Sequence, residues 1–146
     1  MPVKFCPPEE MIWSKSFVME RERYDGADIA HLLRACAKRL DWERLFRRFG
    51  PYWRVLLSHL VLFGFVYPSE RTQIPPKVMD ELVRRLQAET HGPPPAERLC
   101  QGTLLSRAQY LIDIERGGYH DARLTAQPRM TAEEITHWTA AIGAQK

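Results

Sequence analysis

The sequence contains 146 residues, of which 45% are hydrophobic and 27% are charged, a balance that excludes a disordered chain and favours a globular one. The formal net charge is +3, and acidic residues are interspersed among the basic ones, so the charge permits contact with nucleic acid without indicating it. Cys6, Cys36 and Cys100 are far apart in the sequence and odd in number, which argues against a disulfide framework or a zinc knuckle. We therefore expect a reducing, cytoplasmic location.

The first residues carry a strand pattern, because Val3 and Phe5 alternate with Lys4. A lone strand is not stable without a partner sheet, and no second convincing strand follows in the sequence. We therefore expect the chain to begin in the middle of a fold.

Five helices are expected in the first 89 residues. Proline pairs open the first and the fifth, Asp25 and Asp41 are candidate N-caps of the second and third, and Gly50 ends the third. The expected ranges are 7–23, 26–38, 42–49 and 52–66, with the fifth helix beginning at residue 76. The segment 52–66 is apolar nearly all round, so we expect it to be central, and its apolar run is too short to cross a membrane.

Residues 91–95 read His-Gly-Pro-Pro-Pro and predict a stiff linker. The predicted domains are a helical bundle at 1–89, a Pro-rich linker at 90–97 and a C-terminal helical extension at 98–146. Capping boxes that begin at Ser106 and Thr131 predict two helices in the extension, with an irregular segment at 117–129 between them. The predicted fold class is all-α, a multi-helix bundle around a central apolar helix, with a short N-terminal β-strand.

Lys15 is the sharpest anomaly in the pattern. Met11 and Ile12 lie one turn before it and Val18 and Met19 one turn after it, which places the lysine in the middle of an apolar helix face. An ammonium group there needs a path to solvent, a carboxylate, or the phosphate of a ligand.

Arg23, Asp25 and Asp28 follow Lys15 at the expected corner between the first two helices. Together the four residues predict a charged cluster that could hold a triphosphate or orient a catalytic carboxylate. In the structural alternative, which spacing alone favours, Asp25 caps the second helix, Asp28 is the acid of a capping box, and the two cations pair with these acids.

Other candidates are weaker. The five histidines show no metal-ligand spacing, and His59 on the apolar segment is typical of a core histidine. Arg44, Arg47 and Arg48 predict a solvated helix face, with a nucleic-acid patch as the alternative.

Residues 6–33 resemble a bacterial nucleotidyltransferase family, including the nucleotidyltransferase toxins of abortive-infection systems, in the segment that follows the catalytic sheet. The shared pattern is a helix with Lys15, then Arg23, then Asp25 and Asp28, then an apolar helix. The resemblance continues through 53–68, 102–124 and 130–138.

The resemblance implies that Lys15, Arg23, Asp25 and Asp28 line or brace a nucleotide cleft. In that family the Gly-Gly and Asp-x-Asp motifs that hold Mg²⁺ on the triphosphate lie upstream, and this sequence has no such segment. The resemblance therefore implies that Mg²⁺ and a nucleoside triphosphate bind only when a separate catalytic core completes the site. Gly102, Thr103, Asp113 and Glu115 echo the missing signature loosely, but we expect the two acids on a helix, where they point in different directions.

The leading hypothesis is a nucleotidyltransferase-like helical domain that is inactive alone and pairs with a separate core, or with a second copy of itself through the N-terminal strand. The alternatives are an antitoxin-like protein-interaction domain and a weak nucleic-acid-binding domain. No membrane association is expected.

Overall fold

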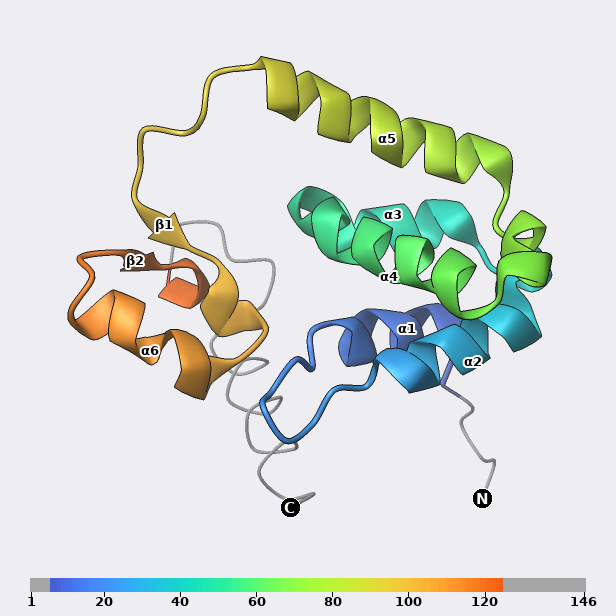
Figure 1. Cartoon of the computed structure of the whole chain (residues 1–146), viewed down its shortest axis with the longest axis horizontal. Coiled ribbons are helices and arrows are strands. Elements are labelled where there is room, and N and C mark those ends of the chain that lie inside the picture. Colours follow the sequence, from blue (N-terminus) through green and yellow to red (C-terminus); the bar gives the residue numbers. More distant parts are fainter. Residues whose placement is uncertain (1–5, 125–146) are drawn as a thin grey trace. The chain divides into compact units, whose positions relative to one another are not determined.

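The computed structural model describes residues 6–124, and this part of the chain is mostly helical, as the sequence predicts (Figure 1). The chain divides into two compact units, the first ending at Pro94 and the second beginning at Pro95. This division falls inside the predicted linker. The predicted strand at 3–5 and the predicted helix that begins at Thr131 lie outside the described residues.

The described part of the first unit contains five α-helices joined by short turns. The α-helices are α1 (Pro8–Ser16), α2 (Gly26–Cys36), α3 (Trp42–Phe49), α4 (Trp53–Val66) and α5 (Pro76–His91). The joining 3-10 turns are η1 (Ala37–Arg39), η2 (Gly50–Tyr52) and η3 (Pro68–Gln73). Prolines begin α1 and α5 because the first turn of a helix needs no N–H from them.

Helix α4 contacts each of the other four α-helices of this unit, and Figure 1 shows it between α5 and the α1–α2 pair. Its residues Leu56 and Phe63 are fully buried. Fully buried residues from the four surrounding helices complete this core: Ile12, Leu33, Leu45, Phe49 and Leu82. The apolar character predicted for 52–66 therefore corresponds to the helix that contributes most to the core of this unit.

One side of α4 is exposed within the part of the chain that the structure describes. Val61, Leu62, Phe65 and Val66 are exposed, and Phe65 shows 80% of its surface to solvent. Their spacing of three and four residues places them in one stripe along the helix. The apolar sequence of α4 thus reflects two surfaces, a buried one in the core and an exposed apolar stripe.

The stretch Trp42–Val66 is long and apolar enough to meet the length and composition expected of a membrane-spanning helix. This is weak evidence, because the core helix of a soluble protein meets the same criteria. The stretch is also interrupted, since Gly50 ends α3 with a φ of 49° and η2 separates α3 from α4. A left-handed φ is a conformation that glycine adopts without steric cost.

Helix α1 ends at Ser16, so the expected helix at 7–23 is wrong in its second half. The Ser16 hydroxyl donates to the Ile12 carbonyl at 2.6 Å, a local bond that competes with helix continuation. Beyond it, Met19 pairs with Tyr24 in an antiparallel bridge, and the chain reverses between them. Arg23 therefore lies in this turn and not on the face of α1.

Two predicted helix caps are confirmed. The Asp41 carboxylate accepts from the Arg44 N–H at 3.0 Å at the start of α3. The Ser106 hydroxyl accepts from the Gln109 N–H at 3.3 Å at the start of α6 (Arg107–Glu115) in the second unit. In both cases a side-chain oxygen satisfies an N–H that the first helical turn leaves without a backbone partner.

The second unit also contains a strand pair that the sequence did not predict. Strand β1 (Leu99–Cys100) pairs in parallel with β2 (His120–Asp121), in the register Leu99 to His120. The 3-10 turns η4 (Gly102–Leu104) and η5 (Ala122–Leu124) follow the two strands. The expectation that 117–129 is irregular is therefore wrong at residues 120–124.

We predict that Phe63→Ala destabilises the first unit by about 3–5 kcal/mol, because it removes a fully buried ring and leaves a cavity. Phe65→Ala on the exposed stripe is the matched control, and we expect it to change the free energy of unfolding by at most about 0.5 kcal/mol. Urea unfolding followed by circular dichroism measures both. Equal losses would contradict the placement of the two faces of α4.

Candidate functional site

The structure brings the four predicted site residues together at the corner between α1 and α2. The Lys15 ammonium lies 3.1 Å from Asp28 Oδ2 and 3.8 Å from Asp25 Oδ2. Arg23 donates from both Nε and Nη2 to the two oxygens of Asp25, each at 3.3 Å. We call Lys15, Arg23, Asp25 and Asp28 the corner cluster.

The two acids of the corner cluster differ in their surroundings. The Asp25 side chain is 11% exposed and is shared by both cations, whereas the Asp28 side chain is 54% exposed and contacts Lys15. Ion pairs at exposed positions contribute about 0–1 kcal/mol because water screens them. The Lys15–Asp28 pair is therefore the weaker part of the cluster, and the Arg23–Asp25 pair is the more firmly held part.

Asp25 occupies the N-cap position of α2, but its side chain makes no capping hydrogen bond. The structural alternative, in which Asp25 caps α2 and Asp28 belongs to a capping box, is therefore wrong in its capping part. Both carboxylates point instead to the cations, and that part of the alternative agrees with the structure. An acid at the N-cap usually accepts from a backbone N–H of the first helical turn, whereas Asp25 forms ion pairs across the corner.

Lys15 lies beside the apolar face of α1 and not in its middle. The buried positions of α1 are Glu9, Ile12 and Ser16, and the Lys15 side chain is 28% exposed. We expected Lys15 at the centre of this face because we expected the helix to continue past Ser16. The Lys15 ammonium nonetheless contacts two carboxylates, which offset the cost of placing a charge beside a buried apolar face.

His59 on α4 lies close to this corner. It is 3% exposed, and its Nε2 is 3.0 Å from the carbonyl oxygen of Ser16, which only accepts, so Nε2 carries the proton. The ring also stacks on Tyr24, with centroids 6.3 Å apart. Burial lowers the pKa of His59 below its ordinary value of 6.5, and the hydrogen bond to Ser16 opposes this shift only in part. His59 thus tethers the end of α1 to the core as a neutral side chain.

The loose nucleotidyltransferase echo in the second unit is not assembled as a metal site in the structure. Asp113 and Glu115 lie on α6 and not on a strand, as we expected. Thr103 is buried, and its hydroxyl donates to Asp121 at 2.7 Å. Within residues 6–124 no group of three or more His, Cys, Asp or Glu side chains has the geometry of a metal site.

Asp121 is a buried acid that the sequence reasoning missed. Burial raises its pKa, but hydrogen bonds from Arg123 and Thr103 more than offset this and lower the pKa to about 2. Arg123 Nη2 lies 2.6 Å from Asp121 Oδ2, and the Arg123 backbone N–H donates to Oδ1. The available signal was the two-residue spacing of the acid and the arginine, which suits a side chain that accepts from the backbone two residues on. This network orders the end of β2.

No protein-family model, curated protein sequence or solved structure matches this chain.

We predict that Asp25→Asn lowers the free energy of unfolding by about 1–2 kcal/mol, because it removes a largely covered charge that accepts from Arg23 and faces Lys15. Asp28→Asn, at the exposed end of the corner cluster, is expected to cost at most about 0.5 kcal/mol. Urea unfolding compares the two variants. A larger loss for Asp28→Asn would contradict the assignment of Asp25 as the central acid.

We also predict that the first unit loses stability as pH falls below 6.5. The unfolded chain binds a proton at His59 near its ordinary pKa, whereas the folded chain, with its lowered pKa, does so only at a lower pH. The penalty therefore grows from pH 6.5 downward until the folded pKa is reached. Comparison of the wild type with His59→Gln, by urea unfolding at a series of pH values, should show a smaller slope in the variant. His31→Gln on the exposed side of α2 should retain the wild-type slope.

Proposed function

We propose that this chain is the helical C-terminal part of a nucleotidyltransferase-like protein, and that its corner cluster borders the nucleotide side of the cleft. The observation that carries the proposal is the contact of Lys15 with the half-exposed Asp28. The carboxylates that hold Mg²⁺ would come from a catalytic core on another stretch of polypeptide or on a separate protein. By itself this part transfers no nucleotidyl group.

The arrangement of the corner cluster supports an exchange of partners. Asp28 is exposed and holds Lys15 through a single weak pair, so a ligand phosphate could replace it at little cost. Asp25 remains fixed by the two-point contact with Arg23, which keeps the corner in place during that exchange. Lys15 is then a cation that already has a fixed position and can exchange the Asp28 carboxylate for a ligand phosphate.

The exposed stripe of α4 supports the second part of the proposal, the need for another surface. Clustered apolar side chains on a protein surface are typical of sites that a partner covers. Val61, Leu62, Phe65 and Val66 form such a cluster. The same observation supports a second candidate function, a protein-interaction domain that binds no nucleotide.

The test is an NMR titration of the isotope-labelled chain with ATP, GTP, CTP and UTP, each with and without Mg²⁺. We expect weak binding, with Kd in the millimolar range for a single exposed phosphate contact, and amide shifts that concentrate at residues 15–28. Lys15→Ala should weaken binding about fivefold, whereas Lys38→Ala, an exposed lysine on η1, should leave it unchanged.

Two results would refute the proposal. One is tight nucleotide binding that survives Lys15→Ala, which would place the phosphate elsewhere. The other is the absence of any shift at residues 15–28 with all four nucleotides, which would favour the protein-interaction function.

A further inference from the structure

A shallow pocket of about 550 Å³ lies between the start of α1 and the exposed side of α3. Its walls are formed by Glu10, Asp41, Arg44, Arg47 and Arg48. The three arginines stand at positions separated by three and four residues, so they project from the same side of α3. We call this cavity the arginine pocket.

Glu10 holds two of these arginines in place. Arg44 Nη2 lies 3.1 Å from Glu10 Oε1, and Arg48 Nη2 lies 2.9 Å from Glu10 Oε2. The Arg48 guanidinium also stacks over the Trp13 ring, 4.2 Å from its centroid. Because both guanidinium groups are fixed before any ligand arrives, less side-chain entropy is lost when they bind one.

Glu10 cannot accept from all the donors of the two arginines that it pairs with, Arg44 and Arg48. Asp41 already accepts from the Arg44 backbone N–H as the cap of α3, and Glu10 is one carboxylate facing two guanidinium groups. The arginine side chains carry five N–H donors each, more than two Glu10 oxygens can accept. Arg44 and Arg48 remain 43% and 42% exposed, so part of each guanidinium faces the open pocket.

From this geometry we propose that the arginine pocket binds a phosphate group, carried either by a free nucleotide or by a nucleic-acid backbone. Guanidinium forks match phosphate oxygens in pairs, and a tetrahedral phosphate offers oxygens to several forks at once. A carboxylate ligand has only two oxygens and would reproduce what Glu10 already provides. The site is separate from the corner cluster and does not depend on the proposed function.

A change at Glu10 distinguishes a phosphate site from a network that is purely structural. In a phosphate site the negative charge of Glu10 competes for the guanidinium groups. Gln at this position keeps an oxygen that accepts from an arginine but removes the charge, so Glu10→Gln should raise phosphate affinity about fivefold. Arg47→Gln should lower the affinity by a similar factor, because it removes one cation from the wall of the pocket. If the network only braces α1 against α3, neither change alters phosphate binding.

The experiment is an NMR titration with inorganic phosphate that follows the Trp13 indole N–H and the arginine Nε–H signals. We expect saturable shifts with Kd in the millimolar range, strengthened in Glu10→Gln and weakened in Arg47→Gln. Arg84→Gln is the matched control, since Arg84 pairs with Glu81 on α5 and lies outside the pocket. Thermal unfolding of each variant verifies folding, and if Arg47→Gln fails to fold, the Glu10→Gln result decides.

Two further arms identify the source of the phosphate. Tighter binding of a single-stranded decanucleotide than of AMP, with an affinity that falls as salt rises, indicates a nucleic-acid backbone. Equal binding of the two indicates a free nucleotide. The proposal is overturned if none of the three probes produces a saturable shift, or if Glu10→Gln and Arg47→Gln bind phosphate as the wild type does.

Discussion

The corner between α1 and α2 depends on one constraint, the need of the Lys15 ammonium for carboxylates at the edge of an apolar core. Ile12 and Val18, which lie on either side of the lysine in the sequence, are buried, and a cation beside such a core is stabilised by a carboxylate partner. Asp25 and Asp28 meet this need from the start of α2. Asp25 also binds Arg23, so the carboxylate that faces Lys15 is held by the turn that joins the two helices.

The core and the corner reinforce one another through Ser16. Its hydroxyl ends α1 by bonding back to Ile12, and its carbonyl accepts from His59 of the central helix. The termination of α1 therefore places both the corner cluster and the tether to α4. A ligand site at the corner would be tethered through Ser16 and His59 to the helix that contributes most to the core, which suits a group that must stay in position when a ligand binds.

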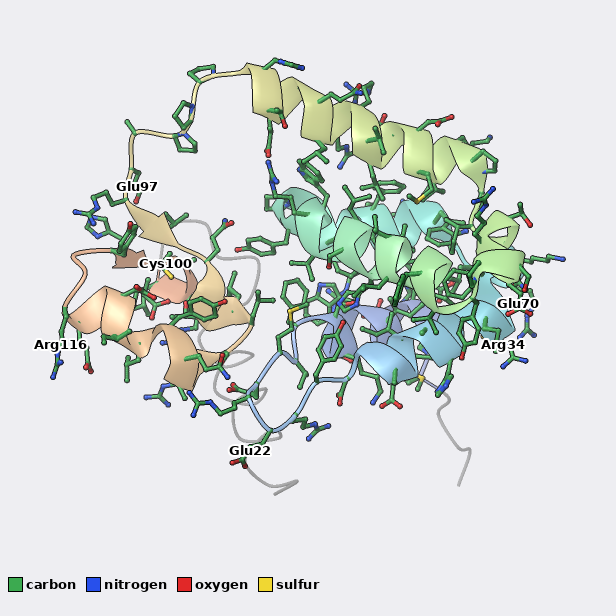
Figure 2. The ribbon with its side chains drawn as sticks, viewed as in Figure 1. Glu22, Arg34, Glu70, Glu97, Cys100 and Arg116 are labelled. Carbon is green, nitrogen blue, oxygen red and sulfur yellow. The ribbon has the colours of Figure 1, made fainter. Side chains whose placement is uncertain are left out.

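The surface of the first unit has three distinct regions. The corner cluster has two cations and two carboxylates, the arginine pocket is lined by three guanidinium groups and two carboxylates, and the stripe on α4 is apolar. At one end of this unit, Arg34 of α2 and Glu70 of η3 are paired at 3.3 Å, and Figure 2 shows both there. Such pairs between exposed side chains contribute little stability. The three regions are therefore better candidates for recognition than an isolated exposed pair such as Arg34–Glu70.

Much of the first unit could be predicted from sequence because its signals are local. The signals lie within or directly beside each helix: its apolar periodicity, the proline pairs, Gly50 and the Asp41 cap. They predict the ranges of α2 to α5 nearly correctly. The early end of α1 was missed because the apolar spacing of a helix continues through Val18 and Met19, whereas in the structure Met19 pairs with Tyr24 in a bridge that helical spacing does not indicate.

In the second unit, too, contacts between segments far apart in the sequence could not be predicted. The two strands are two residues each and pair across 21 positions, so neither has a pattern of its own. For the corner cluster, spacing predicted that the four side chains lie together, as they do, but it assigned Asp25 a cap that its side chain does not make. The arginine pocket could not be predicted, because Glu10 reaches it from another helix.

A double-mutant cycle tests the central claim most directly. Lys15→Gln is combined with the paired change Asp25→Asn and Asp28→Asn, and the free energy of unfolding is measured for the wild type, each side of the cycle and the combination. If Lys15 is held by these two acids, the two changes are non-additive by about 0.5–1 kcal/mol. Strict additivity would show that the lysine makes no energetic contact with them, and it would contradict the dependence of the corner on this interaction.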